Sequence, residues 1–188
     1  MTALRAYAGI GSRETPPPHL LTMRAWGRRL ATDGWTLRSG GADGADSAFE
    51  AGALEAGGAT DIWLPWDGFN GHLTGLAADR VGLYGEACRI AEEHHPAWRR
   101  LGSGPRALMA RNVFQVLGRD LRSPVHFVLC WAPRPRYDPD GRIVDVTGGT
   151  GLAVRLAARL AIPVCHLDYH LSMSALDSIL AQAAEPSF

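Results

Sequence analysis

Three glycine-rich segments contain the residues best suited to bind an anion. They are Gly9-Ile10-Gly11-Ser12-Arg13, Ser39-Gly40-Gly41-Ala42-Asp43-Gly44-Ala45-Asp46 and Thr147-Gly148-Gly149-Thr150-Gly151. Glycine lets a ligand approach the main chain closely, and the first turn of a following helix offers unpaired N–H groups with partial positive charge. Each segment lies where an apolar strand is expected to end. Together they predict one phosphate-binding crevice for a nucleotide-like ligand at the carboxyl edge of a parallel sheet.

The first segment offers main-chain donors and a cation. The residues expected to present N–H groups and a hydroxyl are Gly9, Gly11 and Ser12. Arg13 is the first cation after the first expected strand, and a guanidinium can hold a phosphate through two parallel hydrogen bonds. The structural alternative is an ion pair of Arg13 with Glu14 or Asp43 at the rim.

The other two segments are expected to form further anion cradles. The second cradle comprises Ser39, Gly40, Gly41 and Ala42. A hydroxyl beside successive amides suits an anion or a ribose oxygen, and a tight turn that needs glycine for its conformation alone is the alternative. The third cradle comprises Thr147, Gly148, Gly149 and Thr150, with a hydroxyl on either side of the glycine pair. This cradle opens an expected helix at 149–160 and completes the crevice.

Three carboxylates follow the second cradle: Asp43, Asp46 and Glu50. Their spacings of three and four residues place them near one face of the first turns of a helix expected at 46–56. Carboxylates there would repel a phosphate, but they could accept hydrogen bonds from ribose hydroxyls or act as a general base if partly desolvated. Capping of the helix by Asp43 or Asp46 is the alternative. We expect Asp46, before Glu50, to be the ribose or catalytic contact.

Arg111 and Asn112 interrupt the apolar sequence of an amphipathic helix expected at 106–117. Two adjacent polar residues stand out at such a position. A salt bridge on the helix surface is the structural interpretation of Arg111.

The elements that must position these residues alternate between strand and helix. Expected strands cover 4–10, 35–37, 61–65, 125–131 and 162–167, and further helices are expected after Thr15, near 77–93 and at 172–183. A loop is expected over 132–145. Such alternation predicts an α/β fold with right-handed crossovers and a mostly parallel sheet flanked by helices. Because no repeat or linker divides the pattern, a single domain over residues 1–188 is expected.

Composition limits the function classes. Hydrophobic residues make up 46% and charged residues 20% of the 188 residues, no apolar run approaches the length of a membrane span, and the N-terminus lacks a signal-peptide core. We therefore expect a cytoplasmic protein with no membrane partner. Nineteen basic residues, all arginine, balance nineteen acidic ones. The absence of lysine excludes Schiff-base chemistry, and the neutral charge disfavours nonspecific nucleic-acid binding.

No metal site is expected either. The three cysteines are far apart, without the spacing of a zinc ribbon or an even count for a disulfide framework. The histidine pairs show no complete set of ligands.

The order of the motifs resembles that of a known family. The features that carry the resemblance are the segment Ser39–Asp46 with Phe49-Glu50, the strand at 61–65, Arg111-Asn112, and Gly148-Gly149-Thr150 at the start of a helix. In this order they resemble the Rossmann-like core of DNA-processing protein A. The chain looks most like the short, often phage-encoded relatives of that protein in the SLOG superfamily, which includes the Lonely Guy phosphoribohydrolases. The resemblance spans about residues 6–167.

The resemblance implies a single Rossmann-like domain that holds a nucleotide such as AMP, ADP-ribose or NAD over the strand ends, with no required cofactor. In the resembled families the arginine that matches Arg111 faces the ligand, which implies a phosphate-facing or transition-state role for Arg111. Two further functions are alternatives. One is hydrolysis of an N-glycosidic or phosphate bond, with Asp46 or Glu50 as base and Arg111 stabilising charge. The other is single-stranded-DNA binding in recombination or phage DNA processing. A homo-oligomer is compatible with each of these functions.

The chain departs from both named branches. The Lonely Guy enzymes carry a Pro-Gly-Gly-x-Gly-Thr-x-x-Glu motif with a catalytic glutamate, whereas this chain has no acidic residue in the corresponding helix turn. The basic DNA-binding face of DNA-processing protein A has no counterpart here apart from Arg134, Arg136 and Arg142. We expect these three arginines to lie on a solvated loop.

Overall fold

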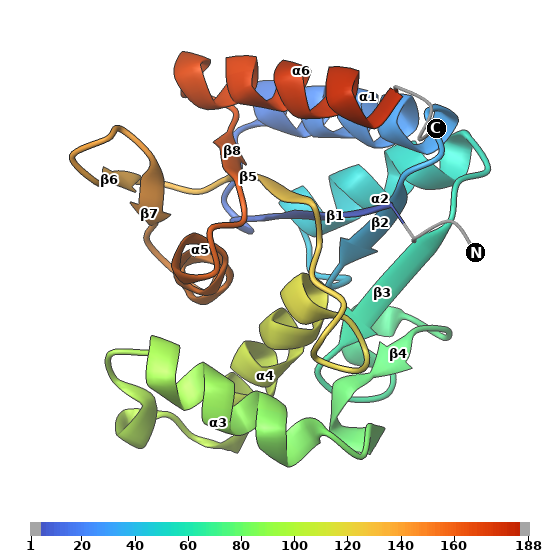
Figure 1. Ribbon diagram of the computed structural model, residues 1–188. Helices are drawn as coiled ribbons and strands as arrows, with labels where there is room; N and C mark the ends of the chain where they lie inside the picture. The colour runs from blue at the N-terminus through green and yellow to red at the C-terminus, as the bar shows by residue number, and fades with distance from the viewer. Residues whose placement is uncertain (1–4, 185–188) are drawn as a thin grey trace.

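The computed structural model describes residues 5–184, which form a parallel sheet between two layers of helices (Figure 1). The strands are β1 (Ala6–Gly11), β2 (Thr36–Ser39), β3 (Thr60–Leu64), β4 (Leu76–Ala77), β5 (Phe127–Trp131) and β8 (Val164–His166). Their order across the sheet is β4-β3-β2-β1-β5-β8, and every neighbouring pair is parallel. The predicted α/β fold is confirmed. The predicted domain ends, residues 1 and 188, lie outside the described residues.

The helices are divided between the two faces of the sheet. They are α1 (Pro17–Thr32), α2 (Ala45–Glu55), α3 (Tyr84–His94), α4 (Ser103–Leu117), α5 (Thr150–Arg159) and α6 (His170–Ala184). One apolar core joins α1, α2 and α6 to the sheet, and the other joins α3, α4 and α5 to its opposite face. None of the helices within residues 5–184 is long and apolar enough to span a membrane.

The alternation of side chains along β1 explains why the strand is central. Tyr7 points into the core of α1 and α2, where its ring stacks on Phe127 with 5.6 Å between centroids. Ala8 and Ile10 belong to the opposite core, beneath α4 and α5. Because β1 is buried on both faces, its sequence is apolar throughout, as is typical of a central parallel strand. Its last residues therefore reach the carboxyl edge of the sheet at a fixed position.

Two segments differ from the sequence prediction. Ala77, expected at the start of a helix near 77–93, belongs with Leu76 to the edge strand β4, which pairs with β3, and α3 begins only at Tyr84. The expected loop at 132–145 contains an antiparallel hairpin of β6 (Arg136–Tyr137) and β7 (Ile143–Asp145). Strands this short carry too few residues for an alternating pattern to show in the sequence.

Helices α1 and α2 approach each other closely at two glycines. A Cβ atom on Gly52 would lie 2.0 Å from the carbonyl oxygen of Arg24, and one on Gly27 would lie 2.4 Å from that of Phe49. The two backbones touch because neither glycine has a side chain. This contact fixes α2 against α1, and the first turn of α2 carries Asp46.

We expect Gly52→Ala to destabilise the protein by about 1–3 kcal/mol, because the added methyl group meets backbone that cannot move aside. The matched control is Gly85→Ala in α3, where a Cβ atom has no neighbour within 4 Å. That substitution should leave stability unchanged or raise it by up to about 1 kcal/mol, since alanine favours helix. Urea denaturation measures both. Equal stability of the two variants would contradict the close helix contact.

Candidate functional site

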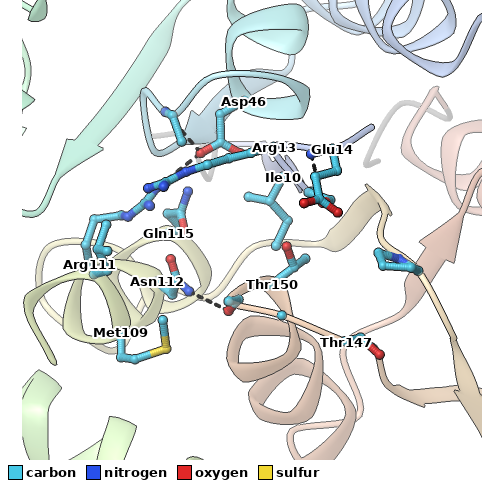
Figure 2. Close-up of a pocket in the computed structure, with 17 residues that line it drawn as sticks. Ile10, Arg13, Glu14, Asp46, Met109, Arg111, Asn112, Gln115, Thr147 and Thr150 are labelled. Atoms are coloured by element: carbon cyan, nitrogen blue, oxygen red, sulfur yellow. Dashed lines mark hydrogen bonds and ion pairs between the residues drawn. The ribbon is translucent and has the colours of Figure 1, made fainter. Parts of the chain in front are cut away.

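A cavity of about 420 Å³ lies at the carboxyl edge of the sheet, between the end of β1, the start of α2, helix α4 and the start of α5 (Figure 2). It brings together residues from all three glycine-rich segments and from α4. The predicted site residues that line it are Gly11, Ser12, Arg13, Ala42, Asp46, Arg111, Asn112, Thr147, Gly148, Gly149 and Thr150. Residues from all three segments therefore line one cavity.

A buried ion pair forms one wall of the cavity. Nη1 of Arg111 in α4 lies 3.1 Å from Oδ2 of Asp46 in α2, and both residues are more than nine-tenths buried. The Asp46 carboxylate also accepts a hydrogen bond from the Ala42 N–H at 3.4 Å. Burial raises the pKa of Asp46, and the guanidinium of Arg111 acts in the opposite direction. Oδ2 of Asp46 is thus engaged by two groups of the protein.

Gly40 and Gln115 complete the surroundings of Arg111. A Cβ atom on Gly40 would lie 1.1 Å from Arg111 Nη1, so any side chain at Gly40 would displace the guanidinium. The Gln115 amide is oriented by its neighbours: its oxygen accepts from the Gly40 N–H at 2.8 Å and from Arg111 Nη1 at 3.3 Å, and its nitrogen donates to Asn112 Oδ1 at 2.9 Å. Nε of Arg111 is buried and has no hydrogen-bond partner within residues 5–184.

Gln115 is a member of the site that the sequence analysis did not identify. It is 1% exposed and lies four residues after Arg111, on the same side of α4. The sequence feature that could have identified Gln115 is its position: it is a polar residue one helical turn after Arg111, within the apolar part of the helix.

The end of β1 is held by its own hydrogen bonds. The Ser12 N–H donates to the Trp131 carbonyl at 3.0 Å, and Ser12 Oγ accepts from the Glu14 N–H at 3.0 Å. The Ser12 carbonyl accepts from the Thr15 hydroxyl at 2.7 Å. The Ser12 N–H that the sequence suggested as an anion donor therefore belongs to the sheet, and the turn presents its side chains to the cavity.

Arg13 extends from this turn toward Arg111 (Figure 2). It is exposed and forms no ion pair with another residue of the described chain. The two guanidinium groups are close enough that the charge of Arg13 helps to lower the pKa of Arg111, after the larger effect of burial. Because Asp46 neutralises Arg111, Arg13 contributes an uncompensated positive charge to the cavity.

The third segment forms the N-terminus of α5 on the opposite wall. Gly148 and Gly149 are exposed, and their N–H groups donate to no other group within residues 5–184. The Gly149 carbonyl accepts from Asn112 Nδ2 at 3.0 Å, which ties this turn to α4. Unpaired N–H groups and the positive end of the helix dipole thus face the same cavity as Arg13.

Three further predicted site residues do not line the cavity: Gly41, Asp43 and Glu50. Asp43 accepts from Asn70 Nδ2 at 3.0 Å, and the same nitrogen donates to the Gly41 carbonyl at 3.1 Å. Glu50 lies 3.9 Å from Nδ1 of His72, and burial raises its pKa. Asp43, Gly41 and Glu50 therefore contact the loop after β3.

Gly9 and Ser39 also lie away from the cavity. A Cβ atom on Gly9 would lie 2.7 Å from Leu37 and 2.8 Å from Phe49, so Gly9 makes room for the core. The Ser39 hydroxyl donates to the Gly9 carbonyl at 2.7 Å and is fully buried. Both residues therefore contribute to the packing of the sheet edge and not to the cavity wall.

We expect Asp46→Asn to destabilise the protein by about 3–5 kcal/mol, because it leaves the Arg111 charge buried without a counter-ion. The double variant Asp46→Asn/Arg111→Met should lose less than the sum of the two single variants, by about 0.5–3 kcal/mol. Asp140→Asn, at an exposed pair with Arg142, is the acid-to-amide control and should change stability by less than about 1 kcal/mol. Additive losses in this cycle would show that the pair is not coupled.

Comparison with protein-family models gives no match, and neither does comparison with curated proteins. Solved structures do match. DNA processing protein A from Helicobacter pylori is 20% identical, with a TM-score of 0.54 over 94% of this chain and 73% of that one. The Moco carrier protein of Chlamydomonas reinhardtii is also 20% identical, with a TM-score of 0.53 over 94% of this chain and 98% of that one. These likenesses show a shared fold, and they confirm the resemblance to DNA-processing protein A that the sequence predicts.

Proposed function

We propose that this protein binds a small molecule that carries phosphate and ribose, of the class of AMP, ADP-ribose or NAD, in the cavity at the sheet edge. The observation that carries the proposal is the convergence of Arg13, Arg111 and the N-terminus of α5 on one cavity. A volume of about 420 Å³ is within the range of roughly 300–1,000 Å³ that small-molecule sites occupy.

The phosphate is assigned to the space between Arg13 and the N-terminus of α5. There it would meet the unpaired N–H groups of Gly148 and Gly149, the helix dipole and the uncompensated guanidinium of Arg13. Asp46 would not repel it strongly, because Arg111 neutralises that carboxylate at 3.1 Å. The second glycine segment supports this arrangement by holding the ion pair, while the first and third segments face the ligand.

The structural neighbours support binding in general. The Chlamydomonas protein is named as a carrier of Moco, and the Helicobacter protein is described as binding single-stranded DNA. The charges of this chain favour the small molecule. Of the three arginines on the hairpin segment, Arg136 pairs with Asp145 at 2.6 Å and Arg142 with Asp140 at 3.6 Å. Two of the three hairpin arginines are therefore already paired with carboxylates.

The two carboxylates that the sequence suggested as a base, Asp46 and Glu50, favour binding over hydrolysis. Arg111 and the Ala42 N–H both donate to Oδ2 of Asp46, so this oxygen is already engaged and is a poor acceptor for a proton from water. Glu50, the other candidate base, faces His72 outside the cavity.

We expect Arg13→Ala to weaken the binding of AMP or ADP-ribose by about 1.5–3 kcal/mol, or roughly 10- to 150-fold, since a charge-assisted hydrogen bond is lost. Arg99→Ala removes an exposed arginine away from the cavity and should leave affinity unchanged. Isothermal titration calorimetry gives both affinities. If both variants bind as the wild type does, the ligand does not use Arg13.

A second variant tests the N-terminus of α5. Gly149→Asp should weaken nucleotide binding about tenfold or more, because the new carboxylate repels a phosphate at this position. Stability should hold or rise slightly, since an acidic residue at a helix N-terminus is favourable. Gly85→Asp adds the same charge to the first turn of α3, away from the cavity, and should not affect binding. Binding that survives Gly149→Asp would place the phosphate elsewhere.

A further inference from the structure

Glu14 is a charged residue that lines the cavity but takes no part in the proposed phosphate site. It lines the cavity beside Arg13 and is exposed. Within residues 5–184 its carboxylate forms no ion pair and accepts no hydrogen bond; only its main-chain N–H is engaged, by Ser12 Oγ at 3.0 Å. A carboxylate without a partner beside an anion site needs an explanation, because it would weaken the binding of a bare phosphate.

Arg13 and Glu14 are neighbours in sequence but point to different parts of the cavity. Figure 2 shows the Arg13 side chain extended toward Arg111, with the Glu14 carboxylate on the other side of Ile10 from the Arg111 guanidinium. The cavity is therefore polarised: the cations Arg13 and Arg111 lie in one part, and the Glu14 carboxylate lies in another. A ligand that fills it should carry an anion at one end and hydrogen-bond donors at the other.

The position of Glu14 is fixed by the main chain. Ser12 Oγ accepts from the Glu14 N–H, and the Ser12 carbonyl accepts from the Thr15 hydroxyl at 2.7 Å. The Ser12 N–H is in turn bound to Trp131 of β5 at 3.0 Å. The turn is thus tied to the sheet, so the backbone of Glu14 is fixed at the rim of the cavity.

We propose that Glu14 accepts hydrogen bonds from the ribose hydroxyls of the ligand and so makes the site selective for ribonucleotides. This inference rests on the proposed function. An ionised carboxylate only accepts hydrogen bonds, and the two adjacent hydroxyls of ribose are donors that can meet its two oxygens. In a 5′-nucleotide they lie on the sugar next to the phosphate, which suits a site where anion-binding and donor-binding groups flank one cavity. Glu14 is then a specificity-determining residue.

The test compares three probes, AMP, 2′,3′-dideoxy-AMP and pyrophosphate, on the wild type and on Glu14→Ala by isothermal titration calorimetry. The wild type should bind AMP about tenfold or more tightly than dideoxy-AMP, the loss expected when hydrogen bonds to a charged group are removed. Glu14→Ala should bind AMP about tenfold more weakly than the wild type and should no longer distinguish the two nucleotides. Its affinity for pyrophosphate should be equal or higher, because a negative charge has been removed from the cavity.

The outcomes separate this inference from the proposed function. If the wild type binds none of the three probes, the phosphate site itself fails. If the wild type binds all three but treats AMP and dideoxy-AMP alike, the phosphate site stands and the role of Glu14 is overturned. The same holds if Glu14→Ala weakens both nucleotides equally, because Glu14 would then contact a group other than the hydroxyls. Glu93→Ala, an exposed acid at the end of α3 and outside the cavity, is the control and should change none of the affinities.

Discussion

The buried ion pair of Asp46 and Arg111 is the constraint on which the sheet edge depends. Two charges removed from water cost several kcal/mol each unless their partners are well placed. Arg111 must lie against the main chain at Gly40, which leaves no room for a side chain there. Asp46 must hold the turn through the Ala42 N–H, and Gln115 must bridge Gly40 to α4. The second glycine segment is therefore shaped by a contact within the protein.

This constraint explains how the three segments divide their roles. The second segment and α4 form a neutral, rigid wall, because their charges satisfy each other. The turn after β1 and the start of α5 then present the groups that remain available: Arg13, Glu14 and the N–H groups before α5. Asn112 links the two walls by donating to the Gly149 carbonyl at 3.0 Å.

The fold could be predicted from the sequence where elements are long. Continuous apolar runs indicated β1 and β5, and the order of strands and helices indicated a parallel sheet. The short strands β4, β6 and β7 could not be predicted, since tertiary pairing forms them. Within the site, helical spacing suggested that Asp43 lies beside Asp46, but α2 begins only at Ala45 and Gly44 has a φ of 82°, so the spacing rule does not reach Asp43. No sequence pattern indicated that Arg111 would form an ion pair with Asp46.

A crystal structure of the protein with AMP is the most direct test of the claim that this cavity holds a ribonucleotide. We expect the phosphate within about 3 Å of the Gly149 N–H and the Arg13 guanidinium, with the Asp46–Arg111 pair intact and the ribose hydroxyls at Glu14. AMP bound with its phosphate away from the start of α5, or bound only after Arg111 leaves Asp46, would contradict this claim.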